Sequence, residues 1–119
     1  MPTVLIVDDH EAFRLSARRL LETEGFSVVG EAPDGMTALR CAREMAPDVV
    51  VLDVMLPDID GFDVAKRLCA DGDPPAIILT SSRDPSDFAP LIAASGARGF
   101  VPKSDLTGEA LRALIPSVR

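Results

Sequence analysis

The sequence predicts an α/β fold, a doubly wound parallel sheet of five strands with helices on both faces. Short apolar segments alternate five times with longer segments of helical periodicity. Such alternation is typical of parallel sheets with right-handed crossovers. The third apolar segment, Val49–Asp53, places three valines and a leucine before its aspartate. That composition is expected of a strand buried on both faces, so this segment should form the centre of the sheet.

In the first half of the chain, helix-capping residues and changes in hydrophobic periodicity mark the boundaries between the expected strands and helices. Gly25 should end the first helix, and Asp34 followed by Gly35 should begin the second. The second strand alternates more than the others and should lie at a sheet edge. The expected elements are strand Val4–Val7, a helix with the stripe Phe13, Ala17, Leu20 and Leu21 and with Arg14, Arg18 and Glu22 facing water, strand Phe26–Glu31, a helix that carries Met36, Leu39, Ala42 and Met45 and ends before Pro47, and strand Val49–Asp53.

The second half continues the same alternation, with one local conflict. Asp60 is a plausible N-cap for the third helix. Pro90 would break a fourth helix capped by Asp84, but it is tolerated in the first turn if Asp87 is the cap. We therefore expect the later start, after a long loop. The remaining elements are a helix with Phe62, Ala65 and Leu68 inward, strand Pro75–Thr80, strand Gly99–Val101 and helix Leu106–Ile115.

Length and composition limit the class of protein. The 119 residues fit one domain spanning residues 1–119, and the 47% hydrophobic content indicates a folded chain. The net charge of −7 argues against direct nucleic acid binding. The chain has neither an apolar run of membrane-spanning length nor a signal-peptide pattern at Met1–Thr3. Cys41 and Cys69 fit no metal or redox motif, so we expect two reduced thiols in a cytoplasmic protein.

Polar side chains follow four of the five strands. Asp8 and Asp9 come after the first strand, Asp53 ends the third, Thr80 ends the fourth and Lys103 follows the fifth. Because ligands bind at the carboxyl ends of the strands in open parallel sheets, these groups should converge on one edge. Taken alone, Asp9 could be a helix cap, Thr80 a strand residue and Lys103 a surface lysine. Their shared placement favours a site.

The residues of this edge suit phosphoryl chemistry. Two carboxylates ~4 Å apart repel by about 4 kcal/mol at an effective dielectric constant of ~20. A hard divalent cation such as Mg²⁺ would remove that cost. Lys103 and Thr80 could then neutralise and position a phosphoryl group, and a carboxylate could accept it covalently. His10, the single histidine, is expected to be a solvated turn residue without a role.

Four separated motifs together resemble a known family. They are Val7–His10, Val51–Gly61, Leu79–Ser81 and Gly96–Lys103. In this order they resemble the receiver domain of two-component response regulators, over the whole chain. The Asp-Asp-His and Gly-Phe-Val-Pro-Lys-Ser stretches further resemble regulators of the LuxR/NarL type, which carry a helix-turn-helix output domain. The resemblance implies a flavodoxin-like sheet with strand order 2-1-3-4-5.

The resemblance also implies a phosphoacceptor and a metal site. Asp53 would accept a phosphoryl group from the phosphohistidine of a sensor histidine kinase. Asp9 and Asp53 would bind Mg²⁺ directly, together with the backbone carbonyl of Met55, whereas Asp8 would act through a water molecule. Such a domain phosphorylates and dephosphorylates itself but does not turn over an external substrate.

The remaining implied roles fall on three residues. Lys103 would pair with the phosphate or with Asp53, while Thr80 and Phe100 would form a switch pair in which the ring turns inward as the hydroxyl moves. Many receivers have a cis proline after this lysine, but Ser104 stands here. Because a cis bond before a non-proline residue costs ~2.5–4 kcal/mol, the reach of Lys103 could differ.

Other functions on a similar fold would need different residues at a few positions of this sequence. A Mg²⁺-dependent phosphohydrolase with an aspartate nucleophile, of the haloacid dehalogenase type, would need a second aspartate where Met55 stands. In a flavodoxin, the acidic stretch Asp8–Glu11 would repel the FMN phosphate. A stand-alone receiver acting by protein contact also stays open, as does a homodimer. The chain ends at Arg119, soon after the last helix. The family resemblance favours a DNA-binding domain that was cut away over a stand-alone receiver.

Overall fold

The computed structural model describes residues 2–70 and 72–115 as one layered α/β domain. Five parallel strands form a single sheet in the order β2-β1-β3-β4-β5, which confirms the predicted topology. The expectation about the chain end at Arg119 lies outside the described residues. The elements are β1 (Thr3–Val7), α1 (Glu11–Thr23), β2 (Ser27–Ala32), α2 (Gly35–Met45), β3 (Val49–Asp53), α3 (Gly61–Cys69), β4 (Ala76–Ser81), the 3₁₀ turn η1 (Pro85–Phe88), α4 (Ala89–Ser95), β5 (Gly99–Pro102), the 3₁₀ turn η2 (Lys103–Asp105) and α5 (Gly108–Leu114).

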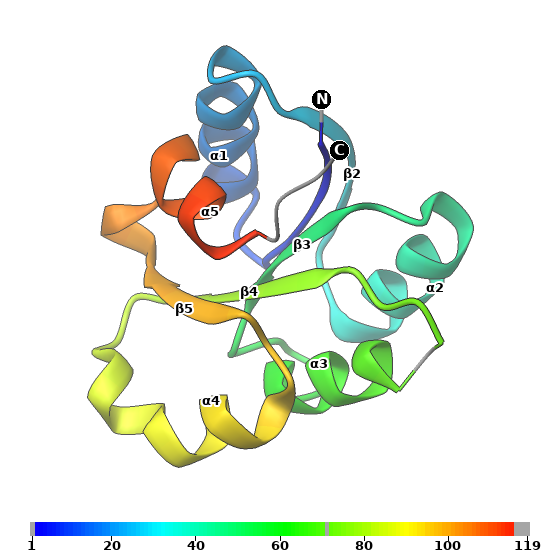
Figure 1. Cartoon of the computed structure of the whole chain (residues 1–119), viewed down its shortest axis with the longest axis vertical. Helices are drawn as coiled ribbons and strands as arrows, with labels where there is room; N and C mark the ends of the chain where they lie inside the picture. Colours follow the sequence, from blue (N-terminus) through cyan, green and yellow to red (C-terminus); the bar gives the residue numbers. More distant parts are fainter. Residues whose placement is uncertain (1, 71, 116–119) are drawn as a thin grey trace.

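The helices cover both faces of the sheet, with α1 and α5 on one side and α2, α3 and α4 on the other (Figure 1). The central strand β3 is buried along its whole length. Val49 and Val51 pack into the core on the α1 and α5 side, whereas Val50 and Leu52 pack into the core on the opposite side. Because both faces of β3 are covered, water reaches this strand only at its ends, and Asp53 stands at the carboxyl end.

The predicted caps account for several helix boundaries. The Asp34 carboxylate accepts a hydrogen bond from the Thr37 N–H at 2.8 Å at the start of α2. Asp60 accepts one from the Phe62 N–H at 2.7 Å at the start of α3. Gly25 follows the C-cap of α1 with a φ of 94°, a left-handed conformation that favours glycine. Local side-chain chemistry therefore sets these ends, as the sequence predicts.

The start of the fourth helix differs from the prediction. Asp84 caps the η1 turn by accepting a hydrogen bond from the Ser86 N–H at 2.8 Å. A separate helix, α4, begins at Ala89, so Pro90 lies in its first turn as expected. The assignment of Asp87 as the cap was wrong, because Phe88 holds that position and makes no side-chain capping bond. The segment after β4 is therefore partly a 3₁₀ turn and not an irregular loop.

Other boundaries shift by one or two residues. Strands β2 and β4 each begin and end one residue later than predicted. Helix α5 begins at Gly108 instead of Leu106, because Thr107 caps it by accepting a hydrogen bond from the Ala110 N–H at 3.0 Å. Leu106 precedes the helix but is still buried. Among the described helices, none combines the length and the apolar character that crossing a membrane requires.

Candidate functional site

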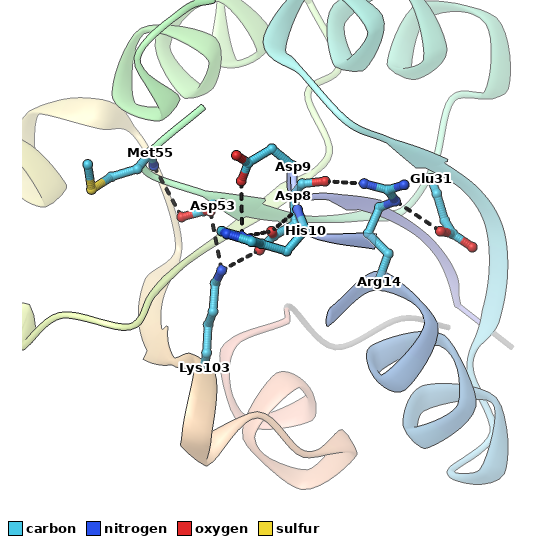
Figure 2. Close-up of polar contacts among 8 residues, drawn as sticks. All are labelled: Asp8, Asp9, His10, Arg14, Glu31, Asp53, Met55 and Lys103. Atoms are coloured by element: carbon cyan, nitrogen blue, oxygen red, sulfur yellow. Dashed lines mark hydrogen bonds and ion pairs between the residues drawn. The ribbon is translucent and has the colours of Figure 1, made fainter. Parts of the chain in front are cut away.

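The carboxyl ends of β1, β3, β4 and β5 bring the predicted groups to one edge of the sheet. Asp53 and Thr80 are paired in register on neighbouring strands, and Thr80 is paired in turn with Val101 on β5. Figure 2 shows the carboxylates of Asp8 and Asp53 and the ammonium group of Lys103 pointing toward one another. A cleft of about 310 Å³ opens above them, lined by Asp9, His10, Asp53, Met55, Leu56, Pro57, Ser81, Ser82 and Lys103.

Lys103 bridges the two buried carboxylates. Its Nζ lies 2.6 Å from Asp8 Oδ2 and 3.3 Å from Asp53 Oδ2, and its ammonium group lies 4.7 Å from the centroid of the Phe13 ring. Ser104 in place of proline therefore does not keep Lys103 from Asp53. Burial alone would lower the pKa of Lys103, but the hydrogen bond to Asp8 and the charges of Asp53 and Asp8 outweigh it and raise this pKa.

Asp53 is almost fully buried, with 3% of its surface exposed. Burial raises the pKa of its carboxyl group, and the charge of Asp8 adds to this increase. A hydrogen bond from the Met55 N–H to Asp53 Oδ1, 3.1 Å long, and the ammonium of Lys103 act in the opposite direction. Because the pKa is raised on balance, the ionised carboxylate is less stable here than in water, and a further cation would stabilise it.

The donor set fits a hard divalent cation. Asp8, Asp9, His10 and Asp53 each offer a ligand atom, and these atoms all lie within 4.8 Å of one another. Three of the four are carboxylates, which suit Mg²⁺, and the single ammonium of Lys103 leaves their charge only partly neutralised. Met55 lies next to this group through its N–H bond to Asp53, whereas metal binding by its carbonyl stays a prediction.

Thr80 has a buried hydroxyl without a partner. Its Oγ1 is inaccessible and forms no hydrogen bond with any described residue. Leaving a buried polar group unpaired costs about 1–3 kcal/mol. Phe100, on the neighbouring strand β5, is half-buried, and its ring centroid lies 6.2 Å from that of Phe88. Phe88 in turn lies 5.6 Å from Phe62 on α3, so three rings connect β5, η1 and α3 beside the site.

Arg14 does not face water, which corrects the prediction from helical periodicity. Its Nη1 donates a hydrogen bond of 2.6 Å to the backbone carbonyl of Asp8, and its Nε lies 3.1 Å from Glu31 Oε1 on β2 (Figure 2). Arg18 also pairs with Glu31, at 2.9 Å. These contacts fasten the end of β1 to α1 and β2. Local sequence gave no signal for Arg14, because its partner Glu31 lies on a different element.

His10, expected to be a solvated turn residue without a role, lies beside the acidic group. Its side chain is 70% exposed, yet its Nδ1 lies 3.1 Å from Asp8 Oδ1 and 3.1 Å from Asp9 Oδ1. The backbone N–H of His10 also donates to Asp8 Oδ1 at 2.8 Å. The imidazole therefore borders the acidic group directly, and its position after two aspartates was the signal available in the sequence.

The loop from β3 to α3 is tied down close to Asp53. The Gly61 N–H donates to the Val54 carbonyl at 2.9 Å, and a Cβ at position 61 would collide with the backbone oxygen of Asp53 and lie 2.6 Å from Val54 Cα. Within this loop, the Asp58 carboxylate accepts hydrogen bonds from the N–H groups of Gly35, at 2.8 Å, and Met36, at 3.0 Å. These bonds lower the pKa of Asp58 and join the loop to the start of α2.

Comparison with known families agrees with this geometry. The family model for the response regulator receiver domain matches residues 4–115. The chain belongs to this family. It is thus a receiver domain of two-component systems, a class that uses Mg²⁺ at an acidic pocket and that is generally not enzymatic toward other molecules.

Named relatives extend the comparison. The receiver domain is 43% identical to BvgA of Bordetella pertussis over 110 residues, which is 92% of this chain and 53% of that protein. It is 37% identical to the transcriptional regulatory protein LiaR of Bacillus subtilis over 111 residues, 92% of this chain and 52% of that protein. The solved signal receiver domain of NarL from Mycobacterium tuberculosis superposes with a TM-score of 0.85 at 32% identity, covering 95% of both chains. The chain spans about half the length of these curated relatives.

Proposed function

We propose that this receiver domain accepts a phosphoryl group on Asp53 from the phosphohistidine of a sensor histidine kinase, with Mg²⁺ as its cofactor. The observation that carries this proposal is the placement of Asp53. Its carboxylate ends the buried central strand, lines the cleft, and lies 3.3 Å from the Lys103 ammonium. No other described carboxylate combines these three features.

Residues of this chain would orient the acceptor carboxylate, hold the metal ion and supply positive charge during phosphoryl transfer. The Met55 N–H holds Asp53 Oδ1, which orients the carboxylate for attack on the phosphorus atom as the bond to the kinase histidine breaks. Asp9, Asp53 and the Met55 carbonyl would hold Mg²⁺ directly, with Asp8 contributing through a water molecule. The ion, when bound, neutralises charge on the phosphoryl oxygens. Lys103 supplies a second positive charge, which matters because phosphoryl transfer depends mainly on positioning and charge.

The conformational response is assigned to Thr80 and Phe100. The unpaired hydroxyl of Thr80 is a free donor one strand away from Asp53, and the half-buried ring of Phe100 would turn inward as that hydroxyl moves toward the phosphate. Moving a population from 1% to 99% requires about 5.5 kcal/mol. One charge-assisted hydrogen bond supplies only about 1.5–3 kcal/mol. Contacts of Lys103 and Mg²⁺ with the phosphate must therefore supply the rest.

Amide NMR with a phosphate mimic tests this coupling. In the wild-type domain, shifts should appear around Phe88 and Phe100. The Thr80→Ala variant should still bind the mimic but show much smaller shifts at those two residues. Shifts of wild-type size in the variant would remove Thr80 from the switch.

The output and partners follow from the relatives. The name of LiaR describes a transcriptional regulatory protein, which supports control of transcription through a helix-turn-helix domain outside this chain, in the cytoplasm. In this proposal the receiver itself contacts the kinase, and a second receiver if it dimerises, but it binds neither nucleic acid nor a membrane. Met55 occupies the position where a phosphohydrolase would carry a second carboxylate, so the domain is expected to phosphorylate and dephosphorylate itself at Asp53 without turning over an external substrate.

Incubation with a small phosphodonor and Mg²⁺, followed by intact mass measurement, tests the phosphoacceptor. The wild-type domain should gain one phosphoryl group, and Asp53→Asn should gain none. Asp48→Asn is a matched control, because Asp48 precedes the same strand at its opposite end and, among the described residues, its carboxylate accepts hydrogen bonds only from Thr3. That variant should be labelled like the wild type. Full labelling of Asp53→Asn would overturn the assignment.

A further inference from the structure

His10 occupies the N-cap position of α1 without capping the helix. Residues at this position usually accept a hydrogen bond from the first turn through a side-chain oxygen. The His10 side chain makes no such bond. Its ring turns back toward the end of β1, where Nδ1 faces the carboxylates of Asp8 and Asp9 (Figure 2). The side chain of His10 is therefore directed at the acidic site and not at its own helix.

The distance from Nδ1 to Asp9, a proposed direct ligand, matches the distance between neighbouring metal ligands. His10 Nδ1 lies 3.1 Å from Asp9 Oδ1. It also lies 3.1 Å from Asp8 Oδ1, on the carboxylate that would act through a metal-bound water. Adjacent ligands on an octahedral ion with bonds of about 2.1 Å are about 3.0 Å apart. The same spacing also suits an Nδ1–H group shared between the two carboxylates. These two arrangements have opposite consequences for metal affinity, so they can be separated by experiment.

Lys103 leaves this side of the acidic group free. Its ammonium contacts Asp8 Oδ2 and Asp53 Oδ2, whereas His10 faces Asp8 Oδ1 and Asp9 Oδ1. The two basic side chains thus use different oxygens of Asp8. A cation held on the His10 side would not have to displace Lys103 from Asp8.

We propose that His10 is a direct metal ligand of this receiver domain, through Nδ1, and that it shifts the selectivity of the acidic site from Mg²⁺ toward Mn²⁺. Carboxylates and water suit both ions, but Mg²⁺ is a hard cation that takes oxygen ligands, whereas Mn²⁺ is the first member of the divalent first-row series that binds sites with nitrogen ligands. The ring is 70% exposed, so it can adjust to an ion without disturbing the core. This inference rests on the proposed function, because the acidic site must first bind a divalent cation.

Metal titration by calorimetry tests the selectivity, using the untagged chain so that His10 is its one imidazole. The ratio of the Mg²⁺ dissociation constant to the Mn²⁺ dissociation constant should fall about tenfold or more in His10→Ala, since removing even a supporting group of a metal ligand costs about 10–100-fold in affinity. Glu11→Gln is the matched control. It changes the charge at the next residue without removing a proposed ligand, so both affinities should fall alike and the ratio should stay constant.

Spectroscopy of the Mn²⁺-loaded protein provides a second measurement. In a sample labelled with ¹⁵N only at histidine, a ¹⁵N hyperfine coupling to Mn²⁺ can come only from His10. That coupling should be present in the wild-type protein and should survive in Glu11→Gln. Its absence from a sample shown to bind Mn²⁺ would overturn direct ligation.

The possible failures are distinguishable. If His10 only shares a proton with the carboxylates, His10→Ala should bind both ions more tightly by the same factor, and the unchanged ratio would refute the inference alone. If the wild-type domain binds neither ion, the metal site fails and the Mg²⁺-dependent function fails with it. Phosphoryl labelling that depends on Mg²⁺, combined with an unchanged ratio, would retain the function and reject the role of His10.

Discussion

Replacing Thr80 with valine should stabilise the metal-free receiver domain and impair its switch. The Thr80 hydroxyl is fully buried and has no hydrogen-bond partner among the described residues. An unpaired buried hydroxyl costs about 1–3 kcal/mol, and valine keeps the branched shape without the polar group. Part of the gain is lost if the added methyl does not fit the space of the hydroxyl, so we expect an increase of about 1–2 kcal/mol in the free energy of unfolding.

Urea unfolding followed by circular dichroism, in the presence of a chelator, measures this change. With a typical slope for a small domain, the midpoint should rise by about 0.5–1 M. Thr107→Val is a matched control of opposite sign. The Thr107 hydroxyl caps α5 by accepting a hydrogen bond from the Ala110 N–H at 3.0 Å, and its loss should cost about 0.5–2 kcal/mol.

The sign of the effect decides the interpretation. If Thr80→Val destabilises the domain as Thr107→Val does, then the Thr80 hydroxyl already has a partner before phosphorylation and is not a free donor. If the variant is more stable but responds normally to a phosphate mimic, the hydroxyl is unpaired but has no part in the switch. Higher stability together with a weakened response at Phe100 is the expected result.

Three further predictions concern the carboxylates. Mg²⁺ at about 100 times its dissociation constant should raise the free energy of unfolding by about 2.7 kcal/mol. Asp9→Ala should stabilise the metal-free domain and abolish this response to Mg²⁺. Thermal melts of the wild type that coincide with and without saturating Mg²⁺ would refute the metal site. Because burial raises the folded-state pKa of Asp53 above 3.8, its contribution to stability is complete below that value and is lost as the pH rises through the folded-state pKa. At neutral pH and in the presence of a chelator, Asp53→Asn should therefore have a larger free energy of unfolding than the wild type, and this difference should disappear in acid. A variant that is less stable than the wild type at neutral pH would contradict the raised pKa of Asp53. Because backbone hydrogen bonds lower the pKa of Asp58, its contribution is present above 3.8 and is lost as the pH falls through the lower folded-state pKa; Asp58→Ala should be less stable than the wild type at neutral pH, with the two unfolding curves converging in acid, and equal stability at neutral pH would show that the loop does not need this tie.

The sheet and the convergence of its polar residues could be predicted because the signals are local or topological. The run from Val49 to Leu52 is apolar on both faces, which only a covered strand explains. Asp34 and Asp60 cap their helices through bonds made within three residues. Once the strand order is fixed, the meeting of Asp53 with Lys103 follows, although fifty residues separate them.

The misassigned residues depend on contacts that a linear pattern does not contain. Helical periodicity gives the direction in which Arg14 leaves α1, but its long side chain bends back to Glu31 and to the end of β1. At the start of the fourth helix, Asp84 and Asp87 have similar capping potential. The packing of Phe88 against Phe62 and Phe100 favours the observed start of α4 after Phe88. Phe62 and Phe100 lie on other elements, so a local sequence pattern does not reveal these contacts.

The hydrogen bond from the Gly61 N–H to the Val54 carbonyl, next to Asp53, makes the two walls of the cleft unequal in stiffness. On one side, the Val54 carbonyl and the Asp58 carboxylate bond to α3 and α2. On the other side, the described side-chain hydrogen bonds of residues 82–87 join only residues 81–86 to one another. A group added to Asp53 meets a rigid support at α3 and a compliant one at η1, so displacement is directed toward α4 and β5. Reporter groups on α3 should therefore register events at Asp53 far less than the same groups on α4.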